Sequence, residues 1–279
     1  MPIRNMGRDD IDFAIWLIDQ EGWGYTHVEL ERMLKLDPEG SFIYEDKRPL
    51  GIVTCVSYGK TGVVGHLVVS KEGRGRKVGQ SLVTAAVEYL EGVGVESMLL
   101  YATPEGTGIY ERFGFRTSRN VLCMNVHASP GPEPLPGCSC ELIRPEDLAD
   151  VISIDRELFG DDRSRVLEML HREFPEHCFK LVRNGRIASF AFGRKTPVGF
   201  DLGPWVGPSD NQAEAEAPLR AFFDAVGPNG VFLGVFSDNP VALSICETLV
   251  KNRVWNTALM VRGKGRYEKD IRRIFGVAA

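Results

Sequence analysis

The pattern of apolar and polar positions along this chain runs through the same series twice. Each half opens with a short apolar segment that ends in Ile-Arg, followed by an acidic turn and a helix with one apolar face. A second amphipathic helix comes next, and then two alternating segments that predict a β-hairpin. In the second half the hairpin turn is Asn184-Gly185, a pair that favours tight turns. The matched openings are residues 3–23 and 141–160.

The series continues in each half with a third strand, a helix, a strand, a short helix and a final strand. Antiparallel strands followed by a strand–helix–strand unit predict an α+β fold, that is, a mixed α/β sheet flanked by helices. A period of roughly 135 residues is too long for a solenoid repeat, so we expect two tandem domains. Three of the matches are the third strands at 62–70 and 199–209, the helices at 79–94 and 211–227, and the strands at 95–103 and 230–238.

A proline-rich segment, VHASPGPEPLPGCSC at 126–140, separates the two halves. Its four prolines and two glycines exclude a helix or an inner strand. Segments of this kind form semi-rigid spacers. The sequence therefore predicts a first domain at 1–126, a linker at 127–140 and a second domain at 141–279.

Composition and charge exclude several classes of function. The 279 residues are 43% hydrophobic and 25% charged, and the formal net charge is -5, whereas a nucleic-acid binder is usually basic. No apolar run approaches the roughly 20 residues that span a bilayer, and no signal-peptide core follows the N-terminal charges. The six cysteines and five histidines show no metal-ligand spacing. We therefore expect no nucleic acid, no membrane and no metal, and a cytoplasmic protein with reduced thiols.

The segment GRGRKVGQSL, residues 73–82, has the composition of a phosphate-binding loop. It connects a predicted strand to a helix that begins near Val78, and a helix N-terminus offers unpaired amides and the positive end of a dipole. Glycines let the backbone approach an anion, and the cations add charge. The segment is not a P-loop, which needs Lys-Ser or Lys-Thr, nor a Rossmann loop, which needs glycine where Val78 stands. On spacing alone, a solvated turn with a run of charges explains it equally well.

A second segment, YATPEGTGIYERFGF at 101–115, favours the phosphate-binding loop over the solvated turn. Together the two segments resemble the GCN5-related N-acetyltransferase (GNAT) family. The family's acetyl-CoA loop, Arg/Gln-x-x-Gly-x-Gly/Ala, is similar to residues 74–79, and its Tyr-Glu-x-x-Gly-Phe signature is similar to residues 110–115. The resemblance covers residues 1–125. Two positions depart from the family pattern, because Lys77 replaces the first loop glycine and Thr103 stands where asparagine is frequent.

The resemblance implies acetyl-CoA as the cofactor, direct attack by an acceptor amine, and a mostly antiparallel, splayed sheet in each domain. Backbone groups of the third strand would pair with the pantetheine arm, and a backbone amide there would polarise the thioester carbonyl. The cofactor-binding residues that it implies are Leu67, Val68, Val69, Arg74, Gly75, Arg76, Lys77, Val78, Gly79, Gln80 and Thr103.

The same resemblance implies the catalytic residues. Tyr110 would protonate the departing thiolate as general acid. The alternative is a core tyrosine that packs on Phe113 and Phe115. His66 and Glu21 are the candidates for the general base. Their alternatives are a structural strand histidine, a helix-end glutamate, and proton transfer through water.

The acceptor would bind beside the turn between the first two helices, where an aromatic side chain can pack on an amine. A helix-capping loop with Trp23 in the core is the alternative. In the second half, a charged cluster beside a phenylalanine would help to shape the acceptor pocket, and a solvated helix face is the alternative. The residues concerned are Trp23, Tyr25, Asp155, Phe159, Asp162 and Arg163.

The second half lacks the cofactor loop. Gly207, Pro208 and Ser209 stand in its place, without a cation, and Pro208 has no amide hydrogen. Cys246 stands where the first half has Tyr110 and is best explained as a buried thiol. This half resembles the C-terminal, acetyltransferase-like domain of a YitH-like subgroup of tandem GNAT proteins. We therefore expect one cofactor per chain, bound by the first domain.

The sequence thus predicts an acetyl-CoA-dependent N-acetyltransferase with a small-molecule amine as its acceptor. A non-catalytic acyl-CoA-binding sensor and a protein lysine or N-terminal acetyltransferase are the alternatives. A homodimer is compatible with the sequence.

Overall fold

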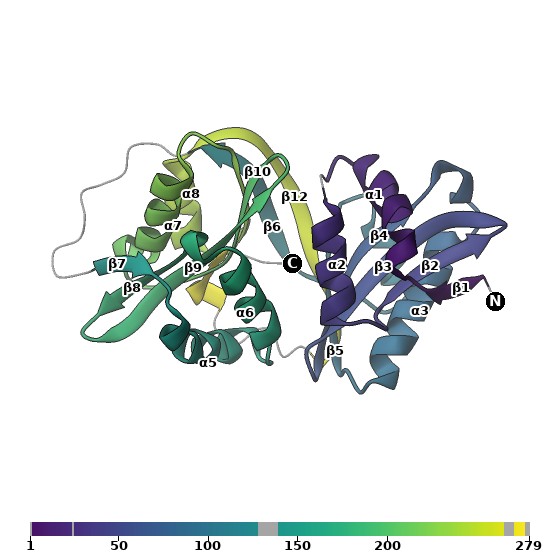
Figure 1. The fold of residues 1–279 in the computed structure, drawn as a ribbon, viewed down its shortest axis with the longest axis horizontal. Coiled ribbons are helices and arrows are strands. Elements are labelled where there is room, and N and C mark those ends of the chain that lie inside the picture. Colours follow the sequence, from purple (N-terminus) through teal and green to yellow (C-terminus); the bar gives the residue numbers. More distant parts are fainter. Residues whose placement is uncertain (1, 24, 128–138, 265–270, 277–279) are drawn as a thin grey trace. The chain divides into compact units, whose positions relative to one another are not determined.

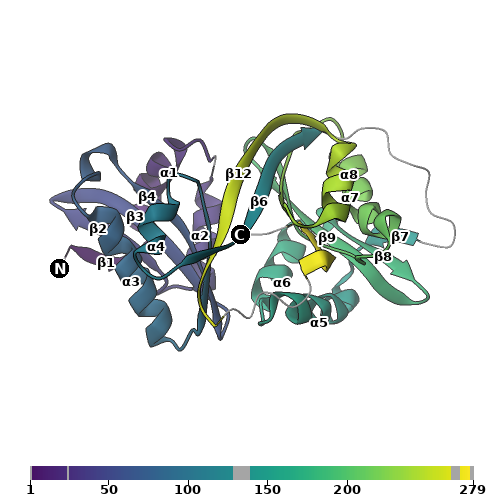
Figure 2. The ribbon, with the colours of Figure 1, turned by 180° about the vertical axis from the view of Figure 1, so that it is seen from behind.

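The structure is a computed structural model that describes residues 2–23, 25–127, 139–264 and 271–276. Within these residues the chain forms two compact units. Unit 1 consists of the described residues in 2–118 and 258–264, and unit 2 of those in 119–257 and 271–276. In each unit, helices cover both faces of a central sheet (Figures 1 and 2).

Unit 1 has the strand order β1-β2-β3-β4-β5-β12. Neighbouring strands are antiparallel except for β4 and β5, which run parallel. Figure 1 shows α1 and α2 in front of this sheet, and Figure 2 shows α3 and α4 on its other face. The bounds are β1 (Ile3–Asn5), α1 (Ile11–Asp19), α2 (His27–Leu36), β2 (Ser41–Asp46), β3 (Arg48–Ser57), β4 (Thr61–Val69), α3 (Val78–Gly92), β5 (Ser97–Ala102), α4 (Thr107–Glu111) and β12 (Val250–Gly263).

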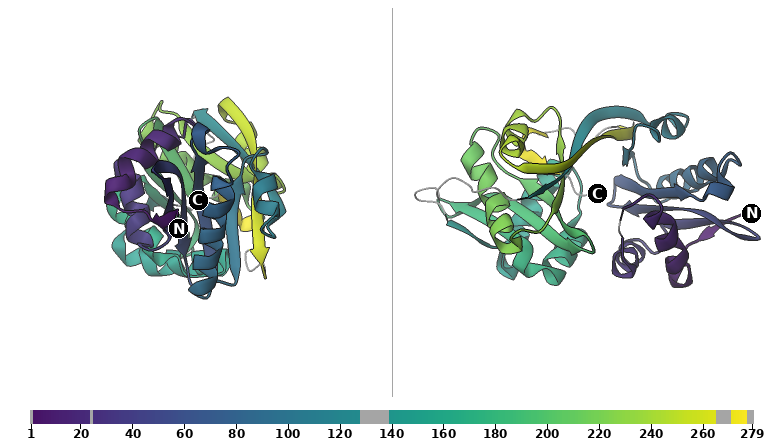
Figure 3. Two further views of the ribbon diagram at one scale, coloured as in Figure 1. Left: turned by 90° about the vertical axis from the view of Figure 1, so that its right-hand side faces the viewer. Right: turned by 90° about the horizontal axis from the view of Figure 1, so that it is seen from above.

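Unit 2 has the strand order β12-β6-β11-β10-β9-β8-β7, and β13 pairs with β10. Here β10 and β11 are the parallel pair. Helices α5 and α6 lie on one face and α7 and α8 on the other, and Figure 3 shows these layers edge-on. The bounds are β6 (Arg116–His127), β7 (Ser139–Leu142), α5 (Leu148–Phe159), α6 (Ser164–Glu173), β8 (Cys178–Arg183), β9 (Arg186–Thr196), β10 (Gly199–Val206), α7 (Gln212–Val226), β11 (Val231–Phe236), α8 (Pro240–Glu247) and β13 (Ile274–Gly276).

Local chemistry sets several of these boundaries. α2 begins after Thr26, whose hydroxyl accepts from the amide of Glu29 at 3.3 Å, while the Glu29 carboxylate accepts from the amide of Thr26 at 2.8 Å. The second hairpin turns at Asn184 and Gly185, with φ of 51° and 72°. Both residues are left-handed, as a two-residue hairpin turn requires, so the predicted turn is confirmed. The order of elements and the mixed α/β class are confirmed as well.

The two halves of the chain exchange their last strands. β6 leaves unit 1 at Ser118 and pairs with β11 of unit 2, where Val121 lies opposite Phe236. β12 returns at Ala258 and pairs with β5 of unit 1, where Ala258 lies opposite Ala102. Consecutive domains at 1–126 and 141–279 would keep each strand in its own half. Apolar periodicity predicts a strand but not its neighbour, so the sequence does not reveal the exchange.

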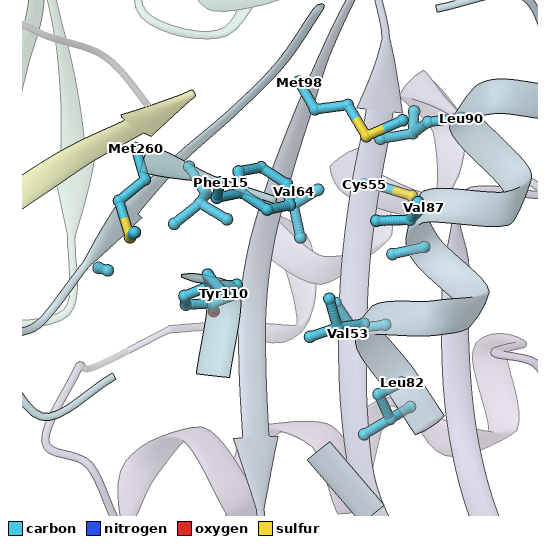
Figure 4. Packing of buried hydrophobic residues seen from close by; sticks show 14 of the residues in the cluster. Val53, Cys55, Val64, Leu82, Val87, Leu90, Met98, Tyr110, Phe115 and Met260 are labelled. Carbon is cyan, nitrogen blue, oxygen red and sulfur yellow. The ribbon is translucent and has the colours of Figure 1, made fainter. Parts of the chain in front are cut away.

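The exchanged end of β12 belongs to the core of unit 1. Met260 is fully buried in the same cluster as Tyr110 and Phe115, which come from the first half of the chain (Figure 4). The predicted linker lies largely outside the described residues, because 128–138 are not described. No helix in the described ranges is long and apolar enough to cross a membrane, and their His, Cys, Asp and Glu side chains form no group that could hold a metal.

Candidate functional site

The two parallel strands of unit 1 separate partway along their length. β4 pairs with β5 over Thr61–Val63, opposite Ser97–Leu99. Beyond these residues β5 continues beside β12, while β4 continues beside β3 as far as Val69. In the described chain, the edge of β4 that faces β5 therefore has no strand partner from Val64 to Val69. The main-chain groups of such an edge can pair with a ligand that runs as an extra strand.

The three residues predicted to contact the cofactor arm lie on this edge. Leu67 and Val69 pack against the core between the sheet and α3, whereas Val68 is buried against α1 and α2. Their side chains thus fix the position of the strand, and their main chain borders the gap between β4 and β5.

A β-bulge in β4 sets the orientation of His66. The register with β3 shifts between Ile52 and Thr54, and His66 has a φ of 47°, a strained left-handed value for a residue other than glycine. The ring nitrogen Nδ1 lies 2.8 Å from Thr54 Oγ1. The rings of His66 and Tyr25 meet edge to face with centroids 4.5 Å apart. The hydroxyl and the aromatic ring together hold the imidazole in one place.

The loop between β4 and α3 presents a row of unpaired backbone amides. The short helical turn η2 (Lys71–Gly73) opens the loop, and the amides of Arg74 and Arg76 after it donate to carbonyls of residues 70 and 73. No side chain in the described chain caps α3. Amides without an acceptor at the start of a helix can bind an anion. Within the described residues, these are the amides of Gly75, Lys77, Val78, Gly79 and Gln80.

Lys77 adopts the backbone conformation of the glycine that it replaces. It is the N-cap of α3 and has φ 62° and ψ 11°, in the left-handed region. Gly75, two residues earlier, has a φ of 75°. Left-handed residues at these positions turn successive amides toward one point, as in anion-binding nests. The substitution therefore adds strain but keeps the donors of the loop.

Two loop arginines form ion pairs at the surface. Arg74 lies 2.9 Å from the Glu21 carboxylate, and its Nε donates to the Val69 carbonyl at 3.3 Å. Arg76 lies 2.7 Å from Asp46. Exposed pairs of this kind contribute about 1 kcal/mol or less, so a phosphate can compete for either cation.

Packing joins the loop, the edge of β4 and helix α4. A Cβ added to Gly79 would lie 3.0 Å from Ile109 Cδ1 and 3.6 Å from Val69 Cγ2. Ile109 immediately precedes Tyr110 in α4. The unpaired amides and the predicted proton donor are therefore parts of one packed region of unit 1.

Tyr110 is a core residue with a titratable hydroxyl. Its side chain is 9% exposed, and its ring packs edge to face on Phe115 with centroids 6.0 Å apart (Figure 4). Burial raises the pKa of the Tyr110 phenol to about 12. The hydroxyl makes no hydrogen bond to a described residue. The phenol therefore stays protonated at neutral pH, as a proton donor must.

The remaining predicted residues of unit 1 are more exposed. Thr103 follows β5 and its carbonyl accepts from the amide of Gly106 at 2.9 Å. Trp23 is 41% exposed, so it is not the core residue that the alternative interpretation requires. The structure brings Tyr25 to His66 and Glu21 to Arg74, whereas Trp23 and Thr103 touch neither pair through a hydrogen bond or ring contact.

The charged cluster predicted in unit 2 is satisfied within the corner between α5 and α6. Asp155 is 2% exposed and accepts from Arg163 at 2.7 and 2.8 Å. The Arg163 guanidinium lies over the Phe159 ring, 4.5 Å from its centroid. Asp162 pairs with Arg156 at 2.6 Å. Because these side chains bind one another, their role in binding an acceptor stays a prediction.

The N-terminus of α7, the counterpart of α3, is closed by its own residues. Asn211 accepts from the amide of Glu214 at 3.2 Å, and the Glu214 carboxylate accepts from Arg183 at 2.7 Å. A carboxylate thus stands near the positive end of the helix dipole. Cys246 is 1% exposed, and burial raises the pKa of its thiol to about 12.

Thr54 is a contact of His66 that the sequence does not reveal. It lies in β3, twelve positions before His66, and no motif marks it. A regular register between β3 and β4 would place Thr54 directly opposite His66. The bulge shifts that register by one residue, so counting along the hairpin does not predict the contact.

Comparisons with known proteins identify the family of both parts of the chain. Residues 11–115 match the family described as "Acetyltransferase (GNAT) family", and residues 151–276 match the "Acetyltransferase (GNAT) domain". The chain is 25% identical to the N-acetyltransferase YitH of Bacillus subtilis over 201 residues, which are 71% of this chain and 70% of that one. It is 34% identical to the mycothiol acetyltransferase of Stackebrandtia nassauensis over 120 residues, or 39% of each chain.

A solved structure from Pyrococcus horikoshii has the same fold. Its TM-score is 0.81 at 23% identity, and the match covers 99% of this chain and 94% of that one.

Replacement of Lys77 by glycine should stabilise unit 1. Lys77→Gly removes the left-handed strain of a side chain with a Cβ, for a net gain of about 0.5–1 kcal/mol in the free energy of unfolding measured with urea. Gln80→Gly is the matched control, because Gln80 lies in the first turn of the same helix and its replacement should cost about 1 kcal/mol. A loss of stability in Lys77→Gly would rule out the left-handed N-cap.

Proposed function

The chain belongs to the GNAT acetyltransferases and is an N-acetyltransferase, and we propose that unit 1 binds acetyl-CoA and transfers its acetyl group to the amine of a small molecule. The observation that carries this proposal is the position of five unpaired amides beside an open strand edge. Acyl-CoA has a pyrophosphate followed by an extended arm with two amide bonds, and these two features require an anion site and a strand edge side by side. No comparable pair of features occurs at α7, where Asn211 and Glu214 occupy the helix start.

The residues that would hold the cofactor divide into three groups. The amides of residues 75 and 77–80 would bind the pyrophosphate, and Arg74, Arg76 and Lys77 would add positive charge. The main chain of Leu67, Val68 and Val69 would pair with the arm. Thr103 lies at the end of β5, where the two strands have separated. When bound, acetyl-CoA supplies an activated acetyl thioester.

The chemical step would use residues on both sides of the gap. A backbone amide on the edge of β4 polarises the thioester carbonyl, which makes the carbon more electrophilic. His66, oriented by Thr54 and Tyr25, takes the proton from the acceptor amine. Tyr110 gives its phenolic proton to the departing sulfur. No covalent bond to the enzyme is needed, because the amine attacks directly.

Glu21, the second candidate for the base, is better suited to orienting Arg74. Its carboxylate lies 2.9 Å from the guanidinium, and such a pair restrains the arginine side chain. We therefore assign proton transfer to His66 and place Glu21 in the support of the cofactor loop.

A small-molecule acceptor is supported by one relative. Mycothiol acetyltransferase of Stackebrandtia nassauensis, by its name, acts on a small molecule, although the match spans 39% of its length. Trp23, exposed beside the start of α2, offers an aromatic surface for an amine. The cytoplasmic location and the homodimer stay predictions.

A single added charge at the start of α3 should separate cofactor binding from helix stability. Gln80→Glu places a carboxylate among the unpaired amides, which favours the helix but repels pyrophosphate. Isothermal titration should show acetyl-CoA binding about three- to tenfold weaker, without a loss of thermal stability. Gln212→Glu, the same change in the first turn of α7, should leave binding unchanged. Equal effects of both variants, or no heat with the unaltered protein, would overturn the cofactor site.

Loss of the Tyr110 hydroxyl should slow turnover without weakening binding. Tyr110→Phe keeps the buried ring and removes the proton donor, so kcat for thiol release should fall about 10²- to 10⁴-fold while the Kd for acetyl-CoA stays the same. Because the phenol pKa is raised to about 12, Tyr110 stays protonated and should cause no alkaline decline of kcat below about pH 11. Tyr44→Phe, in the same core cluster, is the control. Unchanged kcat in Tyr110→Phe would leave Tyr110 as a packing residue.

Removal of the Thr54 hydroxyl should impair catalysis through His66. Thr54→Val keeps the shape of the buried side chain but loses the contact with Nδ1, so kcat should fall about tenfold. His66→Gln removes the proposed base itself, so kcat should fall further, about 10²- to 10⁴-fold. Thr84→Val, whose hydroxyl bonds only within α3, should leave kcat unchanged. An unchanged kcat in His66→Gln would assign the base elsewhere.

A further inference from the structure

The gap between the parallel strands of unit 2 is filled by the chain itself. β10 and β11 pair up to Leu202 and Leu233 and then separate, as β4 and β5 do after Val63. A register shift follows on β10, between Leu202 and Trp205. Beyond it β13 runs antiparallel to β10, with Trp205 opposite Gly276 and Val206 opposite Ile274. β13 thus lies on the strand edge that remains open in unit 1.

The side chains of β13 fit a closely packed slot. Phe275 is fully buried and its ring packs on Trp205, with centroids 5.1 Å apart. A Cβ on Gly276 would lie 3.0 Å from the Cβ of Trp205, and one on Gly207 would lie 3.4 Å from the Phe275 ring. An aromatic residue followed by glycine is therefore the pattern that this slot accepts.

Buried polar groups bind the main chain of the same segment. Asn239 is fully buried, and its Nδ2 donates to the carbonyls of Ile274 at 3.0 Å and Arg272 at 3.3 Å. The amide of Gly207 donates to the Arg273 carbonyl at 3.0 Å. Recognition of consecutive carbonyls is characteristic of sites that bind an extended peptide as an added strand.

We propose that unit 2 is a peptide-binding unit, whose slot takes an extended Ile-Phe-Gly segment and whose resident ligand is β13 of the same chain. The slot lies where the cofactor arm would lie in an acyl-CoA-binding unit, and the anion end of that site is closed by Asn211 and Glu214. A covalent tether gives the resident segment a high effective concentration, so a free peptide binds only when the resident is weakened. This proposal stands on contacts inside unit 2 and does not depend on acetyl transfer by unit 1.

The test uses the full-length chain with Phe275→Ala and a fluorescent peptide of residues 271–276, IRRIFG. Truncating a fully buried phenylalanine should weaken the resident segment by about two orders of magnitude or more. The peptide should bind this variant saturably and raise its melting temperature toward that of the unaltered chain. Binding to the unaltered chain should be at least about tenfold weaker. Saturating acetyl-CoA should not displace the peptide.

The controls make each outcome decisive. A peptide with alanine in place of its phenylalanine should neither bind nor stabilise. Ile274→Ala, which keeps Phe275, serves as the second variant if Phe275→Ala does not fold, and the same results are expected. Equal binding of IRRIFG to variant and unaltered chains, no binding to either variant, or displacement by acetyl-CoA would each overturn the proposal.

Discussion

The structure depends on one constraint, which is that two parallel strands diverge in the middle of each sheet. Their pairing stops after Val63 in unit 1 and after Leu202 in unit 2, and the main-chain groups beyond must find other partners. In unit 1 the described chain leaves this edge open, next to the five unpaired amides of the α3 loop. In unit 2 the edge is covered by β13, and the helix start is capped by Asn211. The same geometry thus leaves an open strand edge in one unit and a covered edge in the other.

Positive φ angles mark the points where unit 1 departs from regular structure. His66 and Lys77 both occupy the left-handed region at a cost of the order of 1 kcal/mol each. At His66 the bulge places the imidazole against Thr54 and Tyr25, and Lys77 lies among the unpaired amides of the loop. Such strain persists because the packing around Gly79, Val69 and Ile109 fixes the loop on both sides.

Much of the fold could be predicted from the sequence, because apolar periodicity and turn residues are local signals. The duplicated series, the Asn184-Gly185 hairpin and the loop at 74–79 all depend on neighbours in the sequence. Local signals do not predict which strands pair with each other. The exchange of β6 and β12, the contact of Thr54 with His66 and the insertion of β13 all join residues far apart in the chain. The family resemblance predicts the candidate site, but the pairing of Glu21 with Arg74 depends on side-chain directions that no motif encodes.

The strand exchange has a consequence for how this chain is made and divided. Unit 1 lacks Met260 and its neighbours until residues 258–263 have been synthesised, so neither half can complete its sheet while the other is absent. A cut between residues 127 and 139 would separate the polypeptide without separating the sheets, since each fragment would still hold a strand of the other's unit. Either half expressed alone would therefore have one missing strand and one surplus strand.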